Sequence, residues 1–289
     1  MWTSIIAFLK KFIVCPAAPV VVEPTPDPVI EPSVEEIPTP DPVLPRAEGP
    51  LLLVDIYWKD VGALPKWPTL AADPRFCGAI IKSTQGTSYP GESWFVKNWQ
   101  RLRVGGGDRY GIDWFRGAYH YLVFNQDGAR QADYYLKVVE KAGGWDNGCI
   151  LPVVDVEQGS PGGPNYDAKA AKVITTTEAF VDRVKKVTGQ EVMLYGRGIM
   201  RDLGIKSKMG CSTVWNPSYT KTMRRMDEQG WPLKDITLWQ YCGDGEANVK
   251  ETLGGYELPS QAPGLGKVDI SVYIGGGGLV GLRRRLLIK

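Results

Sequence analysis

Residues 150–157 read Ile-Leu-Pro-Val-Val-Asp-Val-Glu, a short apolar run that ends in two acids. Such a run predicts a strand whose side chains alternate, so Asp155 and Glu157 point to one face while Val154 and Val156 point to the other. Two acids at the end of an apolar strand are costly to bury, and their charges raise one pKa. One protonated and one ionised carboxyl is what glycoside cleavage needs. An acid pair that only caps the next loop or binds an arginine is the alternative.

The strand that ends in these acids is expected over Cys149–Glu157, and the sequence has seven further apolar runs. Between the first of these runs lie segments whose apolar residues recur with the period of a helix. These runs are Leu51–Tyr57, Cys77–Ser83, Gly117–Val123, Glu191–Tyr195, Ser212–Trp215, Ile236–Tyr241 and Val268–Ile274. Ala129–Ala142 and Ala168–Val187 each place apolar residues on one helical face. Strands that alternate with helices predict a parallel sheet buried on both faces, and eight of them fit a closed β/α barrel. The later connections are short and Gly-rich, so we expect the barrel to be irregular there.

Acids also mark the first and last of these strands. Asp55 lies at the end of the first strand, and Asp269 begins the last one. Either acid alone could be an ordinary helix cap or turn former. Because the chemistry of such barrels lies at the carboxyl ends of the strands, we expect both acids to join Asp155 and Glu157 at one barrel mouth.

Several other kinds of site find little support. His120 is the only histidine, which disfavours a Ser-His-Asp triad and a multi-histidine metal site. It is equally consistent with a hydrogen-bonded barrel residue and with a substrate contact. The five cysteines are widely spaced without a CxxC pair, and Gly275–Gly278 lacks the Lys-Ser/Thr ending of a P-loop. We expect no metal and no cofactor.

The first fifty residues differ from the rest in composition. Residues 1–15 are apolar apart from two lysines, and the unbroken apolar run is too short to span a bilayer. The segment is also a poor signal peptide, because the lysines lie inside the apolar stretch and not before it. We expect this segment to contact either a membrane surface or a partner such as a virion protein. Residues 16–50 hold 11 of the 22 prolines and predict an extended acidic linker. The main domain is expected over residues 51–282, followed by a basic tail over 283–289.

Charge is distributed unevenly between these parts. Residues 1–50 carry three basic and seven acidic residues, a net charge of −4, whereas residues 51–289 carry 31 and 25, a net charge of +6. A basic domain is attracted to anionic polymers such as cell-wall material, membranes or nucleic acid. A solvated surface explains the charge equally well. We expect no nucleic-acid partner.

Ordered motifs across residues 51–280 carry a family resemblance. They are Val54–Ile56, Ala79–Gly86, Gly117–Tyr121, Pro152–Glu157, Trp215–Tyr219, Trp239–Tyr241 and Asp269–Tyr273. Together they resemble the glycoside hydrolase family 25 lysozymes, which are N-acetylmuramidases of bacteria, fungi and bacteriophages. The resemblance implies an α/β fold, an irregular TIM-like β/α barrel of about five β/α units followed by strands with few helices.

The resemblance also implies an activity, with roles for individual residues. The substrate would be bacterial peptidoglycan, cut at the β-1,4 bond between N-acetylmuramic acid and N-acetylglucosamine. Glu157 would be the general acid, and Asp155 would either assist the substrate's acetamido group or act as a direct nucleophile. Asp55 and Asp269 would complete the acidic cluster. The residues expected to bind substrate in the groove are Lys82, Tyr119, Tyr121, Tyr195, Trp215, Trp239 and Tyr241.

The sequence departs from the family pattern at three positions. Gln85 stands where the family often has Glu, and Tyr57 and Cys242 stand where small polar residues are common. The family 18 chitinases are a disfavoured alternative, because their Asp-x-x-Asp-x-Asp-x-Glu motif would place acids at the positions of Ile150 and Val153. A non-catalytic wall-binding or virion structural module on the same barrel is the other alternative. The tethered layout suggests a lysin that acts at the bacterial cell wall, encoded by a bacteriophage for host lysis or carried on its virion.

Overall fold

The computed structural model describes residues 49–61, 65–105, 114–146, 148–223, 231–250 and 252–288. By its contacts the chain divides into two units, Met1–Thr39 and Pro40–Lys289, and all described residues belong to the second. The apolar segment 1–15 and residues 16–48 of the expected linker lie outside the described residues.

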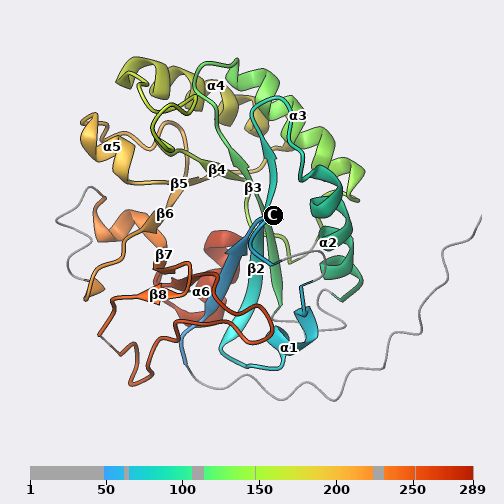
Figure 1. The fold of residues 1–289 in the computed structure, drawn as a ribbon, viewed down its shortest axis with the longest axis vertical. Helices are drawn as coiled ribbons and strands as arrows, with labels where there is room; N and C mark the ends of the chain where they lie inside the picture. The colour runs from blue at the N-terminus through green and yellow to red at the C-terminus, as the bar shows by residue number, and fades with distance from the viewer. Residues whose placement is uncertain are drawn as a thin grey trace, which may run out of the picture. The chain divides into compact units, whose positions relative to one another are not determined.

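Eight strands of the second unit close into a barrel (Figure 1). Seven of them run parallel to their neighbours in chain order: β1 (Leu52–Ile56), β2 (Phe76–Gln85), β3 (Phe115–Tyr121), β4 (Val153–Asp155), β5 (Met193–Tyr195), β6 (Thr213–Pro217) and β7 (Ile236–Gly243). The last, β9 (Asp269–Tyr273), closes the barrel between β7 and β1. A short strand, β8 (Glu246–Ala247), pairs with β7 outside the ring. All eight strands expected from the sequence are present.

The expectation of a parallel sheet holds from β1 to β7 but not for β9, which runs antiparallel to both of its neighbours in the expected irregular part of the barrel. A parallel pair requires a crossover of a dozen or more residues, usually a helix. The described part of the connection from β7 to β9 holds β8 and turns, with no helix. The chain reaches its last strand without a crossover helix and runs there in the reverse direction.

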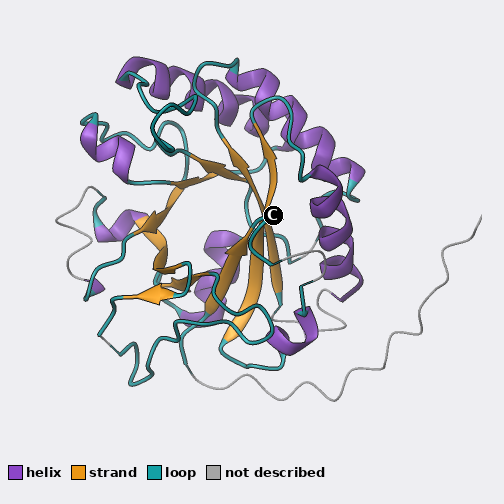
Figure 2. Ribbon diagram, viewed as in Figure 1, coloured by secondary structure: helices purple, strands orange, loops and turns teal. Residues whose placement is uncertain are grey.

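Helices lie around the strands, most of them on the outside of the barrel (Figure 2). They are α1 (Trp67–Ala71), α2 (Glu92–Gly105), α3 (Gly128–Lys141), α4 (Ala170–Thr188), α5 (Gly198–Asp202) and α6 (Gly278–Leu286), with the 3-10 helix η2 (Leu233–Asp235). The two helices predicted from periodicity are α3 and α4. The Asp127 side chain caps α3 by accepting the Arg130 N–H at 2.8 Å, and Gly189 ends α4 in the left-handed region at φ 69°. None of the helices in the described ranges is long and apolar enough to cross a bilayer.

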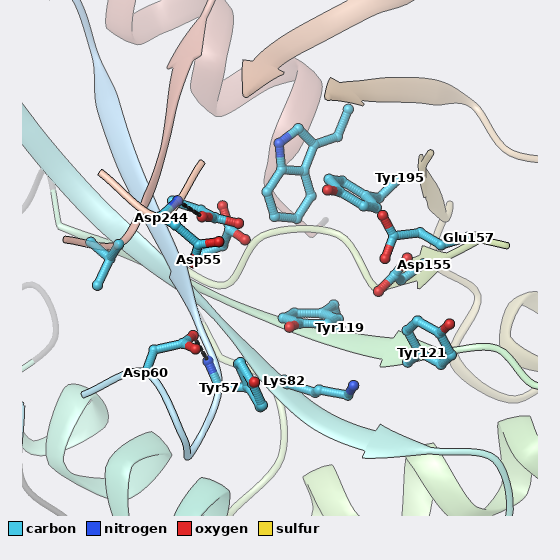
Figure 3. A pocket seen from close by; sticks show the side chains of 13 residues that line it. Asp55, Tyr57, Asp60, Lys82, Tyr119, Tyr121, Asp155, Glu157, Tyr195 and Asp244 are labelled. Atoms are coloured by element: carbon cyan, nitrogen blue, oxygen red, sulfur yellow. Dashed lines mark hydrogen bonds between the residues drawn. The ribbon is translucent and has the colours of Figure 1, made fainter. Parts of the chain in front are cut away.

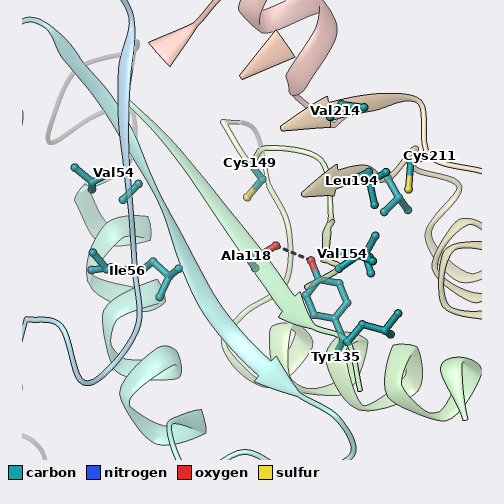
Figure 4. Close-up of a cluster of buried hydrophobic side chains, with 14 of the residues drawn as sticks. Val54, Ile56, Ala118, Tyr135, Cys149, Val154, Leu194, Cys211 and Val214 are labelled. Carbon is teal, nitrogen blue, oxygen red and sulfur yellow. Dashed lines mark hydrogen bonds between the residues drawn. The ribbon is translucent and has the colours of Figure 1, made fainter. Parts of the chain in front are cut away.

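One hydrophobic layer lies between the strands and the helices (Figure 4). Val54 and Val154 point outward from their strands into this layer, as strand alternation predicts. Tyr135 of α3 is fully buried there, and its hydroxyl donates a 2.9 Å hydrogen bond to the carbonyl of Ala118 in β3. The layer fixes the helices against the barrel wall and so fixes the strand ends that carry the site.

A second hydrophobic layer fills the interior of the barrel at the end that α6 covers. Its members include Leu53, Ile80, Phe115, Val153, Met193 and Leu238. Leu282 and Leu286 of α6 pack against this layer, and the Leu286 carbonyl accepts the Leu151 N–H at 2.7 Å. The expected basic tail 283–289 therefore begins inside a helix, whose arginines are exposed while Leu286 is buried. This helix closes the end of the barrel opposite the site.

On three of the parallel strands, β1, β2 and β4, the interior becomes polar two residues further along the strand. Asp55 follows Leu53, and Asp155 follows Val153, on the same inward face. Lys82 follows Ile80 in the same way. Because β9 runs in reverse, its first residue, Asp269, is the one that reaches this polar layer, where it pairs with Asp55. The layer is the floor of the candidate site.

Candidate active site

A pocket of about 200 Å³ opens at the carboxyl ends of the parallel strands (Figure 3). It is lined by Asp55, Tyr57, Asp60, Lys82, Tyr119, Tyr121, Asp155, Glu157, Tyr195, Trp215, Asp244, Val268 and Asp269. The structure thus brings together all four predicted acids and five of the seven predicted substrate-binding residues. Three acidic or aromatic members that the sequence had not singled out as site residues, Tyr57, Asp60 and Asp244, come from the loops around the rim.

Asp155 and Glu157 lie side by side at one edge of the pocket, below Tyr195 in the view of Figure 3. Asp155 is only 4% exposed, and its Oδ1 is buried with no hydrogen-bond partner among the described residues. Burial raises the pKa of Asp155 well above its usual range, and the neighbouring charge of Glu157 adds to the rise. Burial also raises the pKa of Glu157, against the opposing effect of Lys82. The pair is therefore set to hold a proton that free carboxylates would lose.

The backbone that follows β4 is held by a buried asparagine that the sequence did not reveal. Asn165 donates hydrogen bonds from Nδ2 to the carbonyls of Glu157 at 3.0 Å and Leu122 at 2.7 Å. Its Oδ1 accepts the N–H of Phe124 at 2.9 Å. One side chain thus ties the loop after β4 to the loop after β3, and it fixes the backbone from which Glu157 projects.

Lys82 is held among aromatic rings, and within the described ranges it forms no salt bridge. Its Nζ donates a 2.8 Å hydrogen bond to Oε1 of Gln85. Four tyrosine rings surround the ammonium, at centroid distances of 4.5 Å for Tyr121, 5.5 Å for Tyr89, 5.7 Å for Tyr57 and 6.0 Å for Tyr119. Such faces attract a cation. Burial lowers the pKa of Lys82, and the charges of Asp155 and Glu157 oppose that change.

Asp55 and Asp269 share one amide donor on the opposite side of the pocket. Gln240 Nε2 lies 3.1 Å and 3.0 Å from the two carboxylate oxygens of Asp55 and 3.1 Å from Oδ2 of Asp269. Burial raises the pKa of Asp55 well above its usual range, with Asp269 as the next cause. Burial raises the pKa of Asp269 to about 6. Like charges this close favour a state in which the two acids keep a proton.

Two predicted groove residues do not reach the pocket. Trp239 and Tyr241 are fully buried in the layer outside the barrel, where their rings pack edge to face. The Trp239 indole donates to the Ser218 carbonyl at 2.6 Å, and the Tyr241 hydroxyl donates to the Pro259 carbonyl at 2.7 Å. The expectation that they line the groove is wrong, because the residue between them, Gln240, takes the inward position.

His120 is a hydrogen-bonded structural residue on the helix side of the sheet. Its ring nitrogens lie 2.8 Å from Thr84 Oγ1 and 3.1 Å from Gln131 Oε1, and its ring stacks on Phe180. Burial lowers its pKa to about 3. Across the described ranges, no group of three or more His, Cys, Asp and Glu side chains is placed to hold a metal ion.

Comparison with known proteins agrees with this geometry. The sequence model described as Glycosyl hydrolases family 25 matches residues 66–249. The chain belongs to this family. It is therefore a glycoside hydrolase. A comparison with curated protein sequences found no significant match.

Several solved structures share the fold. A family 25 glycosyl hydrolase from Bacillus anthracis is 24% identical with a TM-score of 0.59, over 81% of this chain and 93% of that one. The catalytic domain of an endolysin from bacteriophage P40 of Listeria monocytogenes is 18% identical with a TM-score of 0.53, over 82% and 98%. The modular autolysin LytC of Streptococcus pneumoniae, in complex with a synthetic peptidoglycan ligand, is 15% identical with a TM-score of 0.56, over 77% and 46%.

Proposed function

We propose that this family 25 hydrolase cuts bacterial peptidoglycan at the β-1,4 bond between N-acetylmuramic acid and N-acetylglucosamine. The observation that carries the proposal is the pair of Asp155 and Glu157, side by side and inward-facing at the mouth of the barrel. A peptidoglycan ligand in the structurally similar autolysin supports the choice of substrate.

Glu157 is proposed as the general acid. A general acid must keep its proton near the working pH, and burial raises the pKa of Glu157 in that direction. The backbone of this residue is held by Asn165, so its carboxyl is presented from a fixed position. Proton transfer from Glu157 to the glycosidic oxygen would let the bond break as the leaving alcohol departs.

Asp155 is proposed to assist the acetamido group of the substrate. Its Oδ1 is a buried acceptor with no hydrogen-bond partner in the part of the chain that the structure describes, which is a costly arrangement. The N–H of an acetamido group would satisfy this oxygen and would be held in place for attack by the acetamido oxygen on the anomeric carbon. Direct attack by Asp155 is the competing route. Glycan strands that lack the acetyl groups separate the two, because only direct attack would still cut them.

The remaining pocket residues are proposed to bind the sugar. Tyr119, Tyr121, Tyr195 and Trp215 supply ring faces around the acids, which suit the apolar faces of sugar rings. Lys82 supplies a positive charge close to the acidic pair without pairing with it. Asp55 and Asp269 complete the acidic cluster on the far side of the pocket.

The test is a digest of purified peptidoglycan by the full chain, with borohydride reduction and mass spectrometry of the products. Glu157→Gln is compared with Glu178→Gln, a matched change at an exposed position of α4. Reduced muramic acid ends from the wild type and from Glu178→Gln alone would support the proposal. Reduced glucosamine ends would assign a different bond. Cleavage of chitin oligomers with peptidoglycan left intact would assign a chitinase. Absence of products from every wall would favour a non-catalytic binding or virion module.

We also propose that the enzyme acts at the bacterial cell wall as a tethered lysin. Residues 1–15 would contact a membrane surface or a virion protein, and the Pro-rich residues 16–50 would separate that contact from the barrel. The structural similarity to an endolysin of bacteriophage P40 supports a phage context.

A further inference from the structure

Gln240 contacts two of the acids that line the pocket, although it is not itself among the lining residues. It is fully buried on β7, between Trp239 and Tyr241. Its Nε2 is within hydrogen-bond distance of three carboxylate oxygens of Asp55 and Asp269. Its Oε1 accepts hydrogen bonds from the hydroxyls of Tyr195 and Tyr219, both at 2.9 Å.

The partners on each side determine which way the amide points. One acid of this pair stays ionised even when the two share a proton, and an ionised carboxylate can only accept hydrogen bonds, so the NH2 group faces Asp55 and Asp269. The two tyrosine hydroxyls can donate, and they meet the carbonyl oxygen on the other side. A flipped amide would place its oxygen against carboxylates and would lose both interactions at once. The orientation is therefore specified by the surrounding side chains.

Asp55 depends on this amide more than any other acid in the pocket does. Within the described parts of the chain, Gln240 is the only group that donates a hydrogen bond to the Asp55 carboxylate. Asp269 has a second donor, the backbone N–H of Asp244 at 2.8 Å. Two amide hydrogens serve three oxygens, so the two acids compete for the same donor and are held close together by it.

We propose that Gln240 is a positioning residue of the active site: its amide holds Asp55 and Asp269 across the pocket from Asp155 and Glu157, in an orientation that Tyr195 and Tyr219 select. The proposal rests on the proposed function, because it assigns a supporting role to that reaction. Gln240 touches no substrate in this account and acts through the two acids. Donation from its amide favours the charged form of Asp55.

The experiment replaces the glutamine by an apolar residue of similar length. Gln240→Met in the full chain removes the donor and the acceptor together. Gln131→Met is the matched control, because Gln131 is also fully buried and makes three hydrogen bonds, to His120 and Val123, on the helix side of the sheet. Both variants are measured for kcat and KM on peptidoglycan fragments, for the pH profile, and for thermal unfolding.

For Gln240→Met we expect kcat to fall about tenfold and the acidic limb of the pH profile to move up by about one unit, with KM changed less than about threefold. The limb moves up because Asp55 loses the donor that favours its charged form. Gln131→Met should lower the unfolding temperature without moving the limb. Gln240→Asn is the second variant, since it keeps an amide but is too short to reach both sides, and it should move the limb in the same direction.

Wild-type kcat and an unmoved acidic limb in either folded Gln240 variant would overturn the inference. Glu157→Gln, measured alongside, separates this failure from failure of the proposed function. If Glu157→Gln abolishes cleavage while the Gln240 variants match the wild type, only the positioning role is wrong. If Glu157→Gln still cleaves, the proposed function is wrong and the positioning role falls with it.

Discussion

Replacing Lys82 by methionine should move the whole pH profile of the enzyme to higher pH. Lys82 carries the positive charge closest to the acidic pair among the residues that line the pocket, and it opposes the rise in pKa of both Asp155 and Glu157. Methionine keeps most of the length and the apolar contact with the tyrosine rings, and it removes the charge. Without that charge, the protonated form of each carboxyl becomes more stable.

The size of the shift follows from the charge separation. Lys82 is hydrogen-bonded to Gln85, so its charge acts on the pair from a distance. At about 6 Å and an effective dielectric constant of about 20, two unit charges interact by about 3 kcal/mol, an upper limit because the pocket opens to solvent. About half of that energy corresponds to one pH unit. We therefore expect both limbs of the bell-shaped profile to rise by about one unit.

The assay is the initial rate of peptidoglycan cleavage between pH 3 and about pH 9, a range chosen to cover both limbs. The alkaline limb reports loss of the proton that the Asp155–Glu157 pair keeps, and the acidic limb reports ionisation of the coupled pocket carboxyls, Asp55 included. Lys82→Arg keeps the charge and is the matched control, so its limbs should stay in place even if kcat falls. A folded Lys82→Met variant with both limbs unmoved would refute the electrostatic role of this lysine.

Three further predictions use other residues. Gln85→Glu places a carboxylate against the Lys82 ammonium, so it should reproduce part of the same upward shift in a pH–rate profile; a downward shift would contradict this. Trp239→Phe should lower the free energy of unfolding by about 2 kcal/mol in denaturant titrations, because it removes part of the buried indole and its hydrogen bond to Ser218. The KM of this variant should not change. A raised KM would instead indicate that Trp239 contacts the substrate in the groove. Deletion of residues 1–50 should change where the protein localises but not its specific activity, as fractionation and a parallel activity assay would show; unaltered localisation would contradict the tether.

The fold and most of the site were predictable because one rule, strand alternation, governs both. The eight strands were visible as short apolar runs, and the acids stood at their ends in the correct phase: Asp155 two residues after Val153, and Asp55 two residues after Leu53. The same rule failed on β7. Both faces of a barrel strand are buried, so the run Leu238–Cys242 does not reveal which phase faces inward. The family resemblance implied that Trp239 and Tyr241 line the groove, whereas the inward residue is Gln240.

Contributions from loops and from strand direction could not be derived in this way. Asp60 and Asp244 reach the pocket from turns, whose conformation has no period to read. Asn165 lies ten residues beyond Asp155 and reaches back to the Glu157 carbonyl through the fold of its loop. The scarcity of helix-forming sequence after β7 was visible, and it was the one signal that β9 would not be another parallel strand.

The reversal of β9 has a direct consequence for the chemistry of the site. In a parallel strand of the same sequence, Asp269 would be the first residue at the closed end of the barrel, near α6 and the apolar layer of Leu53 and Val153, where an unpaired carboxylate is strongly disfavoured. The antiparallel direction instead pairs Asp269 with Asp55 and brings both within reach of Gln240. The antiparallel direction of β9 therefore places Asp269 at the barrel mouth, whereas a parallel strand of the same sequence would place it at the opposite end.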